Sequence, residues 1–374
     1  MLAGTAVVVI IVAAIYALVH TGGSKPAAHK NAGSHTVSAL QVLSVLPAAS
    51  SKHVDGSAPV VVAFNAPLAT GSPEPVISPA VAGTWSQIGD DAMFTPVKAL
   101  RPGTRYTVTV PAGASGVQIV GGGHLDKTVT RRFTTRGYSQ LRLAQLLSKL
   151  GYLPLTWSPS QTAGQRSESE QATSAPSSQQ AMAYDPPAGT WTWKHGYPSI
   201  LTSMWQPAAG NVVLRGAVMA FESEHGMLIN GTVNTKLWSA VFRAARTGDR
   251  NGNGYTYALA SKALPESLTI WHNGHIVMRS LANTGIPVSP TVDGTFPVYQ
   301  KYRFQIMRGV NPDGSAYADP VSFVSYFNGG DAVHYFLRGS YGFQQSLGCV
   351  ELPYSSAQQA YPYLTYGSLV TVSG

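Results

Sequence analysis

The chain has 374 residues, which is more than one ordinary domain requires and predicts two or three domains. Hydrophobic residues make up 44% of it and charged residues only 11%, which fits packed, strand-rich domains better than a disordered chain. The net charge is +8, but no dense Lys/Arg run is interleaved with aromatic residues. We therefore expect no nucleic-acid partner, and either a diffuse positive surface facing an anionic polymer or a merely solvated one.

The first nineteen residues, Met1–Val19, carry no charge and are mostly apolar. As a helix they would span roughly 28 Å, close to the hydrocarbon thickness of a bilayer. Residues 20–38 are rich in Gly, Ser, Ala and Lys and are typical of a linker. We predict a retained membrane anchor with extracytoplasmic domains after it, because no clear cleavage site follows. The alternative is a cleaved signal peptide and a secreted protein.

Residues 39–136 show an all-β pattern. Val60–Phe64 is a short apolar strand, Tyr106–Val110 alternates with period two, and Pro/Gly clusters separate such segments. Short strands at this spacing predict a β-sandwich. The segments Val62–Pro67, Leu100–Val108 and Phe133–Thr135 resemble those of bacterial Ig-like domains, and we expect a spacer or packing module without catalytic residues.

Residues 137–248 show helical periodicity around a polar insertion. Leu143, Leu146, Leu147 and Leu150 share one helical face, and similar spacing returns in the segment that contains Leu214, Val218 and Phe221. Residues 158–187 are rich in Ser, Gln, Ala and Pro, which predicts a disordered insertion.

The two helical halves together resemble a small peptidoglycan-binding domain. The matching segments are Leu143–Tyr152 and Ala217–Leu228, continued through Leu237–Trp238. Glu222 stands where that family usually has Gln, and Asn230 where it has Asp. The alternative is an ordinary three-helix bundle without a ligand.

The last part, residues 254–374, is predicted to be β-rich with one small helix. Leu268–Trp271 and His275–Met278 flank Asn273–Gly274, a strong two-residue hairpin signal. Further strands are expected at 296–299, 321–327, 333–336 and 369–372, and a helix at 355–363.

Cys349, the only cysteine of the chain, is the candidate nucleophile. A thiol attacks as thiolate and needs a base nearby, and His334, fifteen positions earlier in an expected strand, could supply one. Gly348 would allow a carbonyl to approach and would free backbone N–H groups for an oxyanion. The alternative is a buried, inert cysteine packed near a strand histidine.

Five ordered segments of this part resemble an L,D-transpeptidase catalytic domain. They are the hairpin at 268–277, Thr284–Gly285, the segment Ser289–Phe296, Gly330–His334, and the nucleophile motif Ser346–Leu352. This resemblance implies two-step acyl transfer on peptidoglycan stem peptides, with Cys349 as nucleophile and His334 as general base and acid. A thioester forms as terminal D-Ala leaves, and a neighbouring stem's amine resolves it into a 3→3 cross-link.

The same resemblance assigns supporting roles. Gly348 and Cys349 would hold the oxyanion through their N–H groups, Ser346 would shape the turn, and Tyr326 would line the substrate groove. No cofactor is expected, since the thioester conserves acyl energy. We expect no metal site either, because His272 and His275 flank a tight turn and do not share a helical face. The partners would be donor and acceptor stem peptides and wall glycan, in the cell envelope.

The nucleophile motif departs from the family pattern at two positions. Leu347 stands where the family usually has His, and Glu351 where it often has Arg or Asn. Glu351 would either attract the acceptor's amine or be a solvated surface charge. Two alternatives to the transpeptidase remain: an L,D-carboxypeptidase, in which water replaces the amine, and a catalytically dead wall-binding scaffold.

Overall fold

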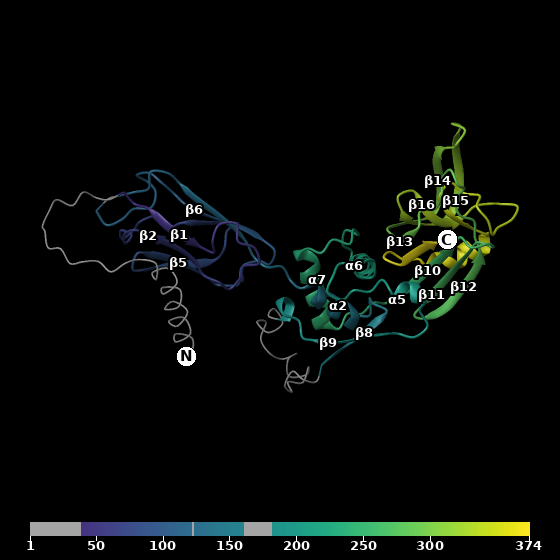
Figure 1. Ribbon diagram of the computed structural model, residues 1–374, viewed down its shortest axis with the longest axis horizontal. Coiled ribbons are helices and arrows are strands. Elements are labelled where there is room, and N and C mark those ends of the chain that lie inside the picture. Colours follow the sequence, from purple (N-terminus) through teal and green to yellow (C-terminus); the bar gives the residue numbers. More distant parts are fainter. Residues whose placement is uncertain (1–38, 122, 161–181) are drawn as a thin grey trace.

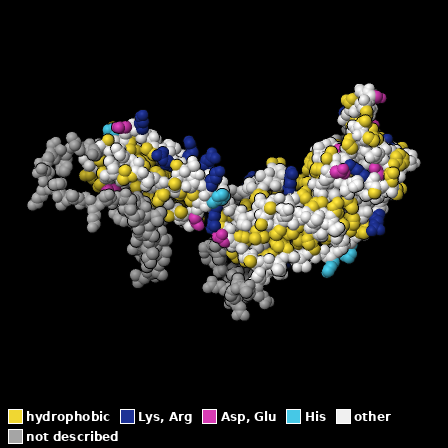
Figure 2. All heavy atoms as spheres, in the orientation of Figure 1, with side chains coloured by type: hydrophobic (Ala, Val, Ile, Leu, Met, Phe, Trp, Pro, Cys, Tyr) yellow, Lys and Arg dark blue, Asp and Glu magenta, His cyan; other side chains and the backbone are white. Residues whose placement is uncertain are grey.

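The computed structural model describes residues 39–121, 123–160 and 182–374. Three parts follow one another along the long axis of the molecule: a β-sandwich, a helical part and a β-rich C-terminal part (Figure 1). Within the described residues no helix is long and apolar enough to cross a membrane. The predicted anchor Met1–Val19 and the linker 20–38 lie outside those residues. Figure 2 shows Lys and Arg side chains spread over several parts of the visible face.

The N-terminal part is a sandwich of two antiparallel sheets, as the alternating pattern predicts. One sheet has the order β1-β2-β5-β4 and the other β3-β6-β7. The core lies between them, where Val62, Phe94, Tyr106 and Phe133 are buried. The strands are β1 (Val42–Leu46), β2 (Val60–Phe64), β3 (Val76–Ser78), β4 (Gly83–Ile88), β5 (Asp91–Pro96), β6 (Arg105–Val110) and β7 (Val129–Thr134).

The helical part combines helices with one small β-hairpin. Its elements are α2 (Gln140–Lys149), β8 (Leu155–Pro159), β9 (Gly189–Trp193), α5 (Ser199–Thr202), α6 (Val212–Glu224) and α7 (Thr235–Thr247). Asn211 and Asn234 cap α6 and α7, each accepting a hydrogen bond from a first-turn N–H group.

The insertion predicted at 158–187 begins later than expected, because its first two residues lie in a strand. Ser158 and Pro159 belong to β8 and pair with Thr190 and Gly189 of β9, so the strand pair encloses the insertion. Residues 161–181 lie outside the described residues.

The helical and C-terminal parts share one hydrophobic core. Leu143, Val213 and Phe221 of the helices lie in the same buried cluster as Tyr257 and Trp271 of the C-terminal sheet. Gly216 of α6 makes this contact close, because a Cβ there would lie 2.6 Å from the carbonyl oxygen of Gly367. The two parts therefore pack as one unit.

The C-terminal part consists of two sheets and one helix. One sheet has the order β12-β11-β10-β18-β13 and the other β14-β15-β16-β17. The elements are β10 (Thr256–Ser261), β11 (Ser267–His272), β12 (His275–Leu281), β13 (Gly294–Pro297), β14 (Gln300–Val310), β15 (Ala316–Asn328), β16 (Asp331–Tyr335), β17 (Val350–Leu352), α8 (Tyr354–Tyr363) and β18 (Leu369–Ser373). Buried residues of both sheets and of α8 form the core between them, among them Ile270, Val333 and Ala357.

Two features of this part bear on the sequence predictions. The hairpin at Asn273–Gly274 is present, and both turn residues have the positive φ that the signal requires, 49° and 84°. By contrast, the whole of β14 and the first half of β15 were missed. They form a long antiparallel hairpin that projects from the body of this part (Figure 1).

Candidate active site

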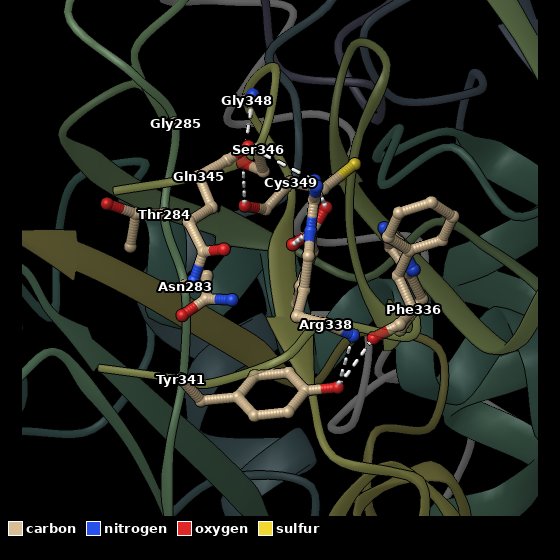
Figure 3. Close-up of polar contacts among 12 residues, drawn as sticks. Asn283, Thr284, Gly285, Phe336, Arg338, Tyr341, Gln345, Ser346, Gly348 and Cys349 are labelled. Carbon is tan, nitrogen blue, oxygen red and sulfur yellow. Dashed lines mark hydrogen bonds and ion pairs between the residues drawn. The ribbon is translucent and has the colours of Figure 1, made fainter. Parts of the chain in front are cut away.

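Two adjacent parallel strands position the predicted nucleophile and base. In the register of β16 and β17, His334 lies opposite Glu351, and Cys349 immediately precedes β17. The thiol of Cys349 is partly exposed and donates to the Gly330 carbonyl at 3.8 Å. In Figure 3 its sulfur points away from the turn made by Ser346 and Gly348.

A cavity of about 830 Å³ opens beside this strand pair, and the β14–β15 hairpin forms one wall. Five of the six predicted site residues line it, namely Cys349, His334, Ser346, Tyr326 and Glu351. The cavity therefore brings together residues that lie up to 25 positions apart in the sequence.

His334 is held as a neutral imidazole. Its side chain is 3% exposed, and burial lowers its pKa. Nδ1 lies 3.0 Å from the carbonyl oxygen of Tyr335, which can only accept a hydrogen bond. Nδ1 therefore carries the proton, and Nε2 has the free lone pair that a general base needs.

Cys349 rests as a protonated thiol. Burial raises the pKa of the thiol to about 12, and the carboxylates of Asp331 and Glu351 act in the same direction. A hydrogen bond from the Ala332 N–H opposes them. The resting pair is thus neutral, and attack requires proton transfer to a base in the same step.

The turn before Cys349 is fixed by Ser346. Its hydroxyl donates to the Cys349 carbonyl at 2.6 Å and accepts from the Gly348 N–H at 3.2 Å. The hydroxyl of Ser346 thus bridges two backbone groups of the turn, and its predicted turn-shaping role stays a prediction. The oxyanion role predicted for Gly348 also stays a prediction, and its N–H donates to Ser346 in this structure.

The environment of Glu351 fits neither role predicted from the sequence, a group that attracts the acceptor's amine or a solvated surface charge. Glu351 is 4% exposed, so it is not a solvated surface charge, and it forms a two-point ion pair with Arg338. Nε and Nη2 of Arg338 each lie 2.8 Å from one carboxylate oxygen. The carboxylate is therefore occupied and unavailable to an incoming amine.

Arg338, which was not predicted from the sequence, stabilises the loop that connects His334 to Cys349. Besides pairing with Glu351, its Nη2 donates to the Gln345 carbonyl at 3.1 Å, and its guanidinium lies over the Phe336 ring (Figure 3). The loop that carries Ser346 is thereby held against β17. An arginine four positions after His334 carried no recognisable signal in the sequence.

The Thr284–Gly285 motif is joined to the same turn. The Thr284 carbonyl accepts from the N–H groups of Gln345 and Ser346, while Thr284 itself donates twice to the buried Glu266. The Gly285 N–H donates to the hydroxyl of Thr291 at 2.8 Å. These motif residues thus support the nucleophile turn from behind.

Tyr326 lines the cavity as predicted, although only 9% of it is exposed. Its hydroxyl donates to Gln305 of β14 at 3.1 Å, which connects the base of the projecting hairpin to the cavity floor. Burial raises the pKa of this phenol, so it is a hydrogen-bonding group at neutral pH.

Comparison with known families assigns two parts of the chain. Residues 36–135 match a bacterial Ig-like domain, and residues 256–372 match the L,D-transpeptidase catalytic domain. The second match covers nearly the whole C-terminal part, from β10 to β18. The helical part lies between the two matches, and the predicted peptidoglycan-binding character is therefore taken up as a proposal.

Three solved L,D-transpeptidases align with the chain at low identity. One from Mycobacterium smegmatis is 14% identical over 90% of this chain and 99% of its own, with a TM-score of 0.30. L,D-transpeptidase 3 from Mycobacterium tuberculosis is 15% identical over 89% and 98%, with a TM-score of 0.30. The catalytic domain of an E. faecium enzyme is 24% identical over 32% and 96%, with a TM-score of 0.30. A search of curated proteins found no match.

Proposed function

We propose that this chain is a peptidoglycan L,D-transpeptidase that forms 3→3 cross-links through a thioester on Cys349. The observation that carries the proposal is the shared cavity: the partly exposed thiol and the neutral imidazole of His334 line the same 830 Å³ space. That volume lies within the usual range of sites that bind small molecules and peptide segments.

In the first step, Nε2 of His334 takes the thiol proton as sulfur attacks the carbonyl carbon of the third stem residue. The C–N bond to terminal D-Ala breaks, and His334 returns the proton to the leaving amine. The neutral resting pair suits this sequence, because the base is unprotonated and the thiolate forms only as substrate is attacked. An acceptor amine then attacks the thioester and restores the thiol.

The alternative activity is L,D-carboxypeptidation, in which water takes the place of the amine. Both reactions use the same acyl-enzyme, so product analysis separates them. The full chain is incubated with tetrapeptide stems, and products are identified by mass spectrometry. Cross-linked dimers support the transpeptidase, tripeptide alone supports the carboxypeptidase, and unchanged substrate supports a dead scaffold. The Cys349→Ala variant should give unchanged substrate.

For the helical part, a wall-binding domain and a three-helix bundle without a ligand are the two predictions. Its shared core with the catalytic domain favours a bundle that supports the catalytic sheet. Binding of the full chain and of Cys349→Ala to purified insoluble peptidoglycan tests a wall-binding role. Equal retention of both proteins would support it, and loss of retention in Cys349→Ala would assign the contact to the active site.

The membrane tether at Met1–Val19 also stays a proposal, supported by the length and apolarity of that segment. Fractionation of cells expressing the full chain tests it. Recovery with membranes after a high-salt wash supports an anchor, and recovery in the medium with a shortened N-terminus supports signal cleavage.

A further inference from the structure

Asp331, the first residue of β16, has a carboxylate beside the nucleophile that the mechanism above does not use. Its two chain neighbours both contact the sulfur of Cys349: Gly330 through its carbonyl at 3.8 Å and Ala332 through its N–H. Asp331 itself lines the active-site cavity. A Cβ placed on Gly348 would lie 2.5 Å from its Oδ1, so this oxygen lies against the nucleophile turn.

The carboxylate of Asp331 is weakly satisfied for its burial. Asn328 donates to Oδ2 at a long 3.4 Å, and the Val292 N–H gives a further hydrogen bond. Within the described ranges no Lys, Arg or His lies within ion-pair distance of it. Burial correspondingly raises the pKa of this carboxyl group. A half-buried carboxylate without a cation is suited to receive one.

The other carboxylate close to the sulfur is already paired. Glu351 has both oxygens on Arg338, whereas Asp331 has only neutral donors. These are the two acidic residues whose charge raises the pKa of Cys349. Glu351 was one candidate for recognising the acceptor's amine, but its carboxylate is paired. Asp331 is therefore the carboxylate near the sulfur that can take this role.

We propose that Asp331 binds the ammonium group of the acceptor stem peptide and accepts one of its protons, which rests on the function proposed above. The acceptor arrives protonated, because a primary alkyl amine has a pKa near that of lysine, about 10.4. An ammonium cannot attack a thioester, so it must lose a proton at the site. Asp331 supplies both the attraction and the proton acceptor.

The ammonium gives one proton to Asp331, and the amine nitrogen attacks the thioester carbon. The C–N bond forms, the C–S bond breaks, and its electron pair goes to the sulfur of Cys349. A second nitrogen proton passes through His334 to that sulfur. The products are an amide, a thiol and a protonated Asp331, which releases its proton to solvent.

The test measures how the acyl-enzyme divides between amine and water. Full-length wild-type protein and Asp331→Asn are given a tetrapeptide donor and an isotope-labelled tripeptide acceptor at neutral pH, and dimer and hydrolysed donor are quantified. We expect the ratio of dimer to hydrolysed donor to fall at least tenfold in Asp331→Asn, with undiminished acyl-enzyme formation. Asp331→Glu, which keeps the charge, should recover part of the ratio.

Hydroxylamine separates the proposed role from a general defect. This acceptor is uncharged at neutral pH, so its reaction with the thioester should be the same in wild type and Asp331→Asn. Asp126→Asn removes an equal charge from an exposed position of the β-sandwich, outside the active-site cavity, and should keep the wild-type ratio.

The possible results distinguish failure of the Asp331 role from failure of the proposed function. An unchanged peptide-acceptor ratio in Asp331→Asn, or an equal loss with hydroxylamine, overturns the role of Asp331 while the proposed function stands. Absence of an acyl-enzyme in the wild type overturns both.

Discussion

Glu351 and Arg338 form a buried, two-point ion pair at the edge of the catalytic cavity, with both N···O distances at 2.8 Å. Glu351 is also the register partner of His334 across β16 and β17. The pair therefore joins β17, the strand that follows the nucleophile, to the loop that follows the strand of the base. Breaking it should affect stability and the site together.

We expect Arg338→Ala to destabilise the fold, because it leaves the Glu351 carboxylate buried and without a cation. Loss of one partner of a buried pair costs roughly 3 kcal/mol, the low end of the range, since the Arg338 side chain is 29% exposed. The free energy of unfolding from urea titration measures the effect. The double variant Arg338→Met/Glu351→Leu should recover part of it.

The control for this prediction is the Lys262–Asp293 pair, at 2.8 Å with Asp293 64% exposed. Asp293→Asn should change the free energy of unfolding by less than about 1 kcal/mol, because exposed pairs contribute little. Equal losses of unfolding free energy in Arg338→Ala and Asp293→Asn would contradict the prediction, because burial of Glu351 would then add nothing to the cost of losing its partner.

Gly348→Ala should disable the nucleophile turn. Gly348 has φ of 119°, where an L side chain is strained by about 1–3 kcal/mol, and a Cβ would also collide with Asp331 Oδ1. We expect at least a tenfold loss of Cys349 acylation, followed by mass spectrometry. Gly339→Ala, where a Cβ meets nothing within 4 Å, should acylate normally. Normal acylation in Gly348→Ala would show that the turn is not required in this form.

Gly216→Ala tests the shared core of the helical part and the catalytic domain. Helix propensity alone predicts a stabilisation of about 1 kcal/mol. The new Cβ would instead meet the Gly367 carbonyl oxygen at 2.6 Å and the Leu369 side chain at 2.9 Å, so we expect net destabilisation. Thermal unfolding should show a lower midpoint, still in one transition for both parts. A raised midpoint would contradict close packing at this contact.

The pH dependence of acylation follows from the neutral Cys349–His334 pair. Burial lowers the pKa of His334 below its usual 6.5, so the base stays unprotonated until the pH falls below that value. Acylation should therefore lose rate only on the acid side of 6.5. Alkylation of the free enzyme by iodoacetamide should rise with pH without a plateau up to about pH 9, because the thiol pKa is about 12. An acid limb centred above 6.5, or a plateau near neutrality, would indicate a thiolate–imidazolium pair.

Sequence reasoning succeeded where local chemistry determines structure. The Asn273–Gly274 hairpin was predictable because both residues tolerate positive φ, and α2 because its leucines repeat at helical spacing. β14 was not predicted, although Phe304 and Ile306 follow the same period-two spacing that indicated the strand at Tyr106–Val110. They are 61% and 44% exposed on the projecting hairpin.

At the site, the residue types were predictable but the partners of the charged groups were not. Cys349, His334 and Ser346, which belong to the quoted motifs, line one cavity together with Tyr326, which the family resemblance suggested. The environment of Glu351 depends on strand register and on an arginine thirteen positions away, neither of which a local pattern reveals. Asp331 was passed over within its own motif for the same reason.

The most direct measurement of the central claim is the intact mass of the full chain after incubation with a carbapenem, which acylates a reactive thiol through its β-lactam carbonyl. We predict one covalent adduct in the wild type, mapped by peptide analysis to Cys349 and absent from Cys349→Ala. A wild-type protein that stays unmodified, or an adduct that persists in Cys349→Ala, would contradict it.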